Sequence, residues 1–107
     1  MGQVLETLRA ARRLIRNPKR WAKGASAFDK NNDPVDPRSP DACRFCSWGA
    51  VQRCASGLGQ ALVVEDVLNG VVKSGTVVGY NDTPRRRHSE ILKAFDRAIA
   101  KAKREGL

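Results

Sequence analysis

The chain has 107 residues and a net charge of +9, with 41% apolar and 29% charged residues. This length provides one hydrophobic core, and the balance of apolar and charged residues excludes a disordered tail. The sequence contains no run of about 18 apolar residues and only three cysteines, which argues against a membrane-spanning helix and against a disulfide framework. We therefore predict one basic helical domain over residues 1–107, with free thiols and a cytoplasmic location.

Positive charge is concentrated at the two ends of the chain. Residues 1–23 contain seven Lys or Arg and one Glu, and residues 84–107 contain eight Lys or Arg and three acidic residues. The middle of the chain is slightly acidic. Any attraction for a polyanion must therefore come from the terminal segments.

The first predicted element is an amphipathic helix over residues 4–16. Its apolar residues recur at spacings of three and four, whereas its arginines fall largely on the other face. Asn17-Pro18 should end this helix, because a proline ring disfavours helical geometry in the preceding residue. Trp21 is expected to anchor the following segment to the core. Residues 24–40 contain three prolines, which predicts a loop with a possible ribbon around Ala27-Phe28 and Val35.

The second predicted helix covers residues 41–56. Ser39-Pro40-Asp41 supplies a capping hydroxyl, a proline for the first helical position and an acid for the first turn. Residues 60–73 favour a buried helix, although Asn69-Gly70 would also suit a hairpin turn.

The end of the chain is predicted to form the last helix, over residues 87–104, with one apolar stripe and one basic face. Residues 76–80 before it should be extended or loop, and residues 81–84 should form a turn in which Asp82 accepts local amide hydrogen bonds. The predicted fold class is mainly α, a single small domain of about four helices. A short two-stranded ribbon is possible within residues 24–38.

Six short motifs stand out along the chain: Trp21-Ala22-Lys23-Gly24-Ala25, Pro34-Val35-Asp36-Pro37, Phe45-Cys46-Ser47-Trp48-Gly49-Ala50, Tyr80-Asn81-Asp82-Thr83-Pro84, Glu90-Ile91-Leu92 and Asp96-Arg97-Ala98-Ile99. Together these motifs resemble a family of short uncharacterised proteins of bacteria and their phages. The resemblance spans about residues 10–100. It implies a phage or mobile-element accessory factor, including an inhibitor of a host defence complex, and it names no activity.

This sequence departs from the family pattern at the start of the last helix. The family has a Thr cap paired with the following Glu, whereas this chain has Arg87 ahead of Glu90. The capping box is therefore expected to be broken, so that the helix start shifts back to Thr83-Pro84 or frays. Cys46 belongs to the family pattern, whereas Cys43 and Cys54 do not.

The three cysteines and the single histidine allow two alternative chemical sites, a zinc site and a catalytic site. Cys43, Cys46, Cys54 and His88 have the residue types of a Cys₃His zinc site. Within one helix, however, Cys43 and Cys54 would lie about 16 Å apart, whereas zinc-bound sulfurs lie about 4 Å apart. We expect these thiols to pack as small hydrophobic side chains.

The second alternative is a small enzyme in which Cys46 is the nucleophile, His88 the base and Asp82 the orienting group. A reactive thiol needs a lowered pKa, and burial of Cys46 between Phe45 and Trp48 would oppose this. We therefore assign no catalytic residue, no metal and no cofactor.

The remaining feature is the basic surface, and we interpret the chain as a non-enzymatic binding protein. Its partner would be a nucleic acid backbone or an acidic protein surface, and not a membrane. The oligomeric state stays open. The candidate binding residues are Arg9, Arg12, Arg13, Arg16, Lys19, Arg20, Arg85, Arg86, Arg87 and Lys101.

Overall fold

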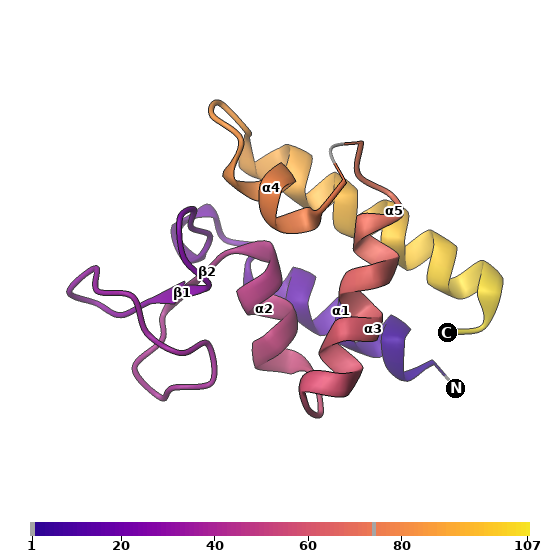
Figure 1. Cartoon of the computed structure of the whole chain (residues 1–107), viewed down its shortest axis with the longest axis horizontal. Coiled ribbons are helices and arrows are strands. Elements are labelled where there is room, and N and C mark those ends of the chain that lie inside the picture. The colour runs from indigo at the N-terminus through magenta and orange to yellow at the C-terminus, as the bar shows by residue number, and fades with distance from the viewer. Residues whose placement is uncertain (1, 74) are drawn as a thin grey trace.

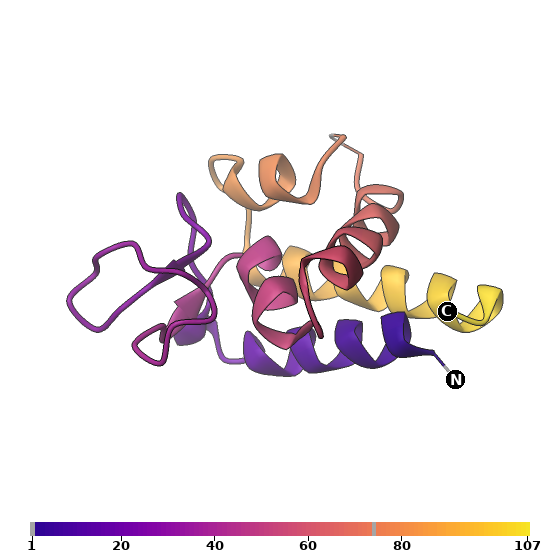
Figure 2. The ribbon, with the colours of Figure 1, turned by 60° about the horizontal axis from the view of Figure 1, so that its bottom comes forward.

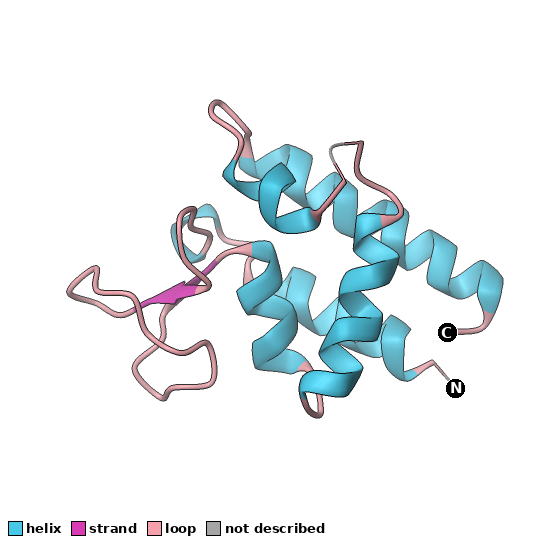
Figure 3. Cartoon of the chain, in the orientation of Figure 1, coloured by secondary structure: helices cyan, strands magenta, loops and turns pink. Residues whose placement is uncertain are grey.

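The computed structural model describes residues 2–73 and 75–107. Five α-helices, one 3-10 turn and one two-stranded sheet occur within these residues (Figures 1 and 3). In chain order they are α1 (Gln3–Leu14), η1 (Pro18–Arg20), β1 (Ala27–Phe28), β2 (Arg44–Phe45), α2 (Ser47–Cys54), α3 (Leu58–Asn69), α4 (Val77–Asp82) and α5 (His88–Glu105). The prediction of a small, mainly helical domain is confirmed.

Helices α1 and α5 lie side by side and run in opposite directions (Figure 2). Leu8 and Ala11 of α1 and Ala98 and Ala102 of α5 have no exposed surface. The small alanines at three of these positions let the two helix axes approach closely. The two basic ends of the sequence therefore become neighbouring helices of one layer.

Helices α2 and α3 cover the apolar side of this pair and complete a single hydrophobic core. Val51 of α2 and Val64 and Leu68 of α3 have no exposed surface. A helix in the region of residues 60–73 is thus confirmed as α3, but it is buried on one side only, because Leu62 and Val63 are half-exposed, and it ends at Asn69. The hairpin alternative is not adopted.

The sheet joins two segments that the sequence did not pair. Ala27 and Phe28 of β1 lie antiparallel to Phe45 and Arg44 of β2, so the partner strand lies outside residues 24–38. The expected contact around Val35 is also present, because the Val35 amide donates to the Ala27 carbonyl at 3.0 Å. The loops on both sides of β1 project from the helical body (Figure 1).

The predicted second helix begins later than expected, at Ser47 rather than at residue 41. Ser39 does accept the hydrogen bond from the Asp41 amide, at 3.1 Å, but the segment closes only a turn. Because Arg44 and Phe45 pair with β1, the helix starts after Cys46, whose sulfur accepts a hydrogen bond from the Gly49 amide.

The connection before α5 also differs from the prediction. Residues 77–82 form a short helix, α4, because the Thr76 hydroxyl caps the Gly79 amide at 3.1 Å. Helix α5 then starts at His88, and the Glu90 carboxylate accepts a hydrogen bond from the Arg87 amide at 2.8 Å. Since this half of the capping box survives, the start neither moves to Thr83-Pro84 nor frays.

A search of residues 2–73 and 75–107 for a helix with the length and apolar character needed to cross a bilayer finds none.

Candidate functional site

A buried polar centre holds together the segments that carry the family-like motifs. Asn81, at the end of α4, has no exposed surface. Its Oδ1 accepts hydrogen bonds from Trp21 Nε1 (2.7 Å), the Ser47 amide (3.1 Å) and Ser47 Oγ (2.7 Å). Its Nδ2 donates to the Ala22 carbonyl and to Asp82 Oδ1, each at 3.0 Å. We call Trp21, Ser47 and Asn81 the Asn81 centre.

A glycine of α2 allows the Asn81 centre to close. A Cβ atom on Gly49 would lie 1.8 Å from the carbonyl oxygen of Ser26. The same carbonyl accepts a hydrogen bond from the Cys46 amide at 3.1 Å, and Asp82 Oδ1 accepts one from the Gly24 amide at 3.2 Å. The motifs starting at Trp21, Phe45 and Tyr80 thus meet at one point and serve packing.

The structure does not join Cys46, His88 and Asp82 into a catalytic arrangement. Cys46 is 4% exposed, and burial raises the pKa of its thiol, although hydrogen bonds from the Gly49 and Trp48 amides oppose the shift. In the described part of the chain, no hydrogen bond links any two of the three side chains.

His88 has a packing role of its own. Its Nε2–H donates to the Ile15 carbonyl at 2.7 Å, and its ring packs against Trp21 with the ring centres 5.7 Å apart. It is half-buried, although three arginines directly precede it in the sequence. It therefore fixes the end of α1 against the start of α5.

The cysteines do not form a metal centre. Cys43 lies before β2 and not in the helix of Cys54, so the distance argument drawn from a single helix does not apply. Among residues 2–73 and 75–107, no group of three or more His, Cys, Asp or Glu side chains is placed to bind a metal ion.

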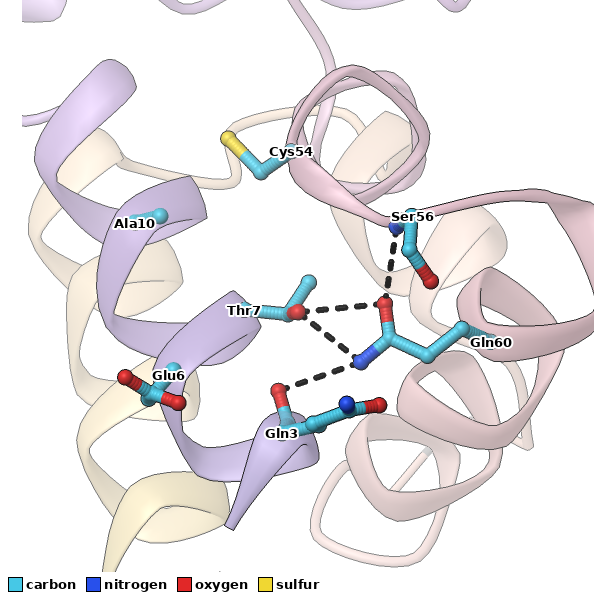
Figure 4. Close-up of a pocket in the computed structure, with 7 residues that line it drawn as sticks. All are labelled: Gln3, Glu6, Thr7, Ala10, Cys54, Ser56 and Gln60. Atoms are coloured by element: carbon cyan, nitrogen blue, oxygen red, sulfur yellow. Dashed lines mark hydrogen bonds between the residues drawn. The ribbon is translucent and has the colours of Figure 1, made fainter. Parts of the chain in front are cut away.

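A hollow of about 320 Å³ lies between α1 and the start of α3 (Figure 4). Its central polar groups are engaged with one another. Gln60 bonds to Thr7 Oγ1 at 2.9 Å, to the Gln3 carbonyl at 3.1 Å and to the Ser56 amide at 3.1 Å. Because both the oxygen and the nitrogen of the Gln60 side-chain amide have hydrogen-bond partners, we interpret Gln60 as a structural link between α1 and α3.

The arginines predicted on the first helix do form one surface. Arg9, Arg12, Arg13 and Arg16 line a shallow hollow of about 210 Å³, together with Ile99 of α5. The Arg12 side chain forms an ion pair with Asp96 of α5, with Nε 2.7 Å from Oδ1. The other three arginines are exposed and make no ion pair within the described residues.

Further exposed cations lie at the seam where the end of α1 meets the start of α5. His88 contacts Ile15, and Lys23 Nζ donates to the Thr83 carbonyl at 3.0 Å, so residues 15–23 lie beside residues 83–88. The exposed cations of both segments therefore share this end of the molecule. We define the basic face as Arg9, Arg12, Arg13, Arg16, Lys19, Arg20, Arg85 and Arg87.

Two of the predicted binding residues lie elsewhere. The Arg86 guanidinium stacks on Tyr80 at 3.6 Å and donates to Glu90 at 3.2 Å. Lys101 Nζ packs against Gly70 at the end of α3. Both side chains thus belong to the α3 and α4 side of α5, whereas α1 lies on its other side. Helical spacing is consistent with the position of Lys101. Arg97 and Lys101 are four residues apart and share one face of α5, which differs from the face of Asp96 that meets Arg12 of α1.

Comparison with known proteins gives one match. A family model described as a family of unknown function (DUF6197) covers residues 1–101. Neither curated proteins nor solved structures gave a match to the chain. The coarse expectation of a family without an assigned activity is confirmed.

Proposed function

The chain therefore belongs to DUF6197, a family of unknown function, and we propose that its own role is to bind the sugar-phosphate backbone of nucleic acid through the basic face. The observation that carries the proposal is the grouping of four arginines around one hollow, of which Arg9, Arg13 and Arg16 are exposed and make no ion pair within the described residues. Arginine side chains bind phosphate oxygens in pairs of hydrogen bonds, and each contact releases counterions.

The character of the basic face favours phosphate over a protein partner. Protein interfaces usually have an apolar centre. The large apolar side chains that are well exposed, Leu58, Leu62, Val63 and Val78, belong to α3 and α4. Ile99 is the one apolar side chain among the residues lining the hollow of the basic face. Contact with an acidic protein would thus depend on charge alone.

The arrangement supports contact with the backbone rather than with bases. The arginines of α1 follow one helix face, and Asp96 orients Arg12 beside them. At the seam of the basic face, Trp21 packs against His88, and its indole N–H donates to Asn81. A ring held in this way is not free to stack on bases. We expect binding without strong sequence preference.

The test is the salt dependence of binding to a fluorescent duplex of arbitrary sequence and to a single-stranded RNA. With about five phosphate contacts, affinity should fall roughly 500-fold for the duplex and roughly 130-fold for the single strand between about 50 and 200 mM salt. Changing Arg9, Arg13 and Arg16 together to Glu should lower the slope of the logarithmic plot by about 3.

A matched control carries the same change of charge away from the basic face. It replaces Lys30, Lys93 and Arg104 by Glu, since these side chains are exposed, do not line the hollow of the basic face and make no ion pair in the described part of the chain. Its salt slope should stay within about one unit of the wild type. An equal loss in both triple variants, or no binding at about 50 mM salt, contradicts the proposal and makes an acidic protein the partner to seek.

A further inference from the structure

A second concave site lies on the side of α5 that faces away from α1. It has a volume of about 550 Å³ and is lined by Val71, Lys73, Tyr80, Arg86, Glu90 and Arg97. Val71 and Lys73 follow the end of α3, Tyr80 belongs to α4, Arg86 lies just before α5, and Glu90 and Arg97 belong to α5. The volume is in the range of small-molecule sites, about 300–1,000 Å³.

Arg86 is held rigidly in the wall of this site. Its guanidinium carbon lies 3.6 Å from the centre of the Tyr80 ring. Its Nε donates to the Tyr80 carbonyl at 2.9 Å, and its Nη1 donates to Glu90 at 3.2 Å. Nη2 has no hydrogen-bond partner among the described residues. A planar cation fixed on two edges is prepared to receive an oxyanion on its remaining edge.

Two further cations face the same space without a compensating acid. Lys73 and Arg97 are exposed and make no ion pair within residues 2–73 and 75–107. Glu90 is already engaged by the Arg87 amide and by Arg86. The lining thus carries three positive charges against one negative charge, which matches a dianion.

From these contacts we propose that the site binds the phosphate group of a phosphate monoester, with Arg86, Arg97 and Lys73 as its ligands. A phosphate monoester carries about −1.5 to −2 charges at neutral pH and offers three acceptor oxygens. The space beyond the phosphate, bordered by Val71, accommodates the group that the phosphate is attached to. The same chemistry occurs in a free nucleotide and at the phosphorylated end of a nucleic acid.

The proposal is independent of the basic face. Arg86 is turned toward Tyr80, and none of the other lining residues belongs to the basic face. Loss of backbone binding would therefore leave the phosphate site in place.

The experiment measures binding of three probes by calorimetry and by amide chemical shifts. The probes are adenosine 5′-monophosphate, a tetranucleotide with a 5′-phosphate, and the same tetranucleotide with a 5′-hydroxyl. We expect saturable binding of at least one phosphorylated probe, with shifts around Val71, Tyr80 and Arg97. Arg97→Glu should weaken this binding by about tenfold or more, because it replaces a ligand by a repelling charge.

Lys93→Glu is the matched control, since Lys93 is exposed on the same helix and does not line the site. Preference for the free nucleotide would identify a small-molecule ligand, and preference for the phosphorylated tetranucleotide would identify nucleic acid ends. Two results would overturn the proposal. The first is equal affinity for the 5′-phosphate and 5′-hydroxyl tetranucleotides together with no binding of the nucleotide. The second is an equal loss of affinity for the phosphorylated probes in Lys93→Glu and Arg97→Glu. The triple variant of the basic face should bind the nucleotide as the wild type does.

Discussion

The Asn81 centre and the basic face show how differently the same protein uses polar residues. At the Asn81 centre every polar atom of the Asn81 side chain has a partner inside the molecule. On the basic face, Arg9, Arg13 and Arg16 have none among the described residues. Polar side chains whose hydrogen bonds are all made inside the protein stabilise the fold. Polar side chains without internal partners are available to bind another molecule.

This contrast predicts that the largest loss of stability comes from Asn81→Ala. The change leaves the Trp21 indole N–H, two Ser47 donors and the Ala22 carbonyl without their buried partner. We expect a loss of about 4 kcal/mol in the free energy of unfolding, measured by urea denaturation. Asn31→Ala, in an exposed loop, serves as the control and should change it by less than about 0.5 kcal/mol. An Asn81→Ala protein as stable as the control would show that the centre contributes nothing.

A smaller loss is expected from Gly49→Ala, which tests the close approach of the loop at Ser26. The added methyl would lie 1.8 Å from a backbone carbonyl, so the loop must move. We predict a destabilisation of about 2–3 kcal/mol by thermal or urea unfolding. In Gly59→Ala the methyl meets nothing within 4 Å inside α3, and the helix should gain about 0.5–1 kcal/mol. If Gly49→Ala and Gly59→Ala change the free energy of unfolding equally, the close contact between Gly49 and Ser26 does not hold the loop in place.

The alkylation rates of the cysteines test whether the region around Cys46 is closed packing. Burial raises the pKa of the Cys46 thiol, and burial also raises that of Cys54 against the opposing charges of Arg53, Arg13 and Arg38. Cys43 is half-exposed. Near neutral pH, Cys43 should therefore be alkylated by iodoacetamide about tenfold faster than Cys46, as followed by mass spectrometry. Faster reaction of Cys46 in the folded protein would revive the hypothesis of a cysteine-dependent enzyme.

The smallest effect on stability should follow from changes in the basic face. Arg13→Glu with Arg16→Glu removes no ion pair within the described residues, and the loss of favourable charge near the end of α1 is offset by reduced repulsion. We expect the free energy of unfolding to change by less than about 1 kcal/mol while nucleic acid affinity falls. A large loss of stability would mean that these arginines support the fold.

The sequence predicted the helices whose apolar residues repeat regularly. Helices α1 and α5 were expected within a few residues of their observed bounds, because their periodicity decides which face is buried. For α3 the same reasoning left a hairpin open, and it did not predict that Leu62 and Val63 would be exposed. The basic residues of α1 could be assigned to the outside for the same reason.

The remaining parts depend on contacts between distant segments. Ser39-Pro40-Asp41 has the residues of a helix start, yet pairing of Arg44 and Phe45 with β1 delays the helix to Ser47. Asn81 has the composition of a turn, and only its contacts with Trp21 and Ser47 explain why it is buried. No local pattern reports such partners.

The spacing of the Asn81 centre along the chain has a consequence for how the protein folds. Its hydrogen bonds join residues that are 34 and 60 positions apart. Such pairs form only after long loops have closed, which is slow compared with the formation of a helix. The indole of Trp21 should therefore reach its native fluorescence late in refolding, after the circular dichroism of the helices has developed.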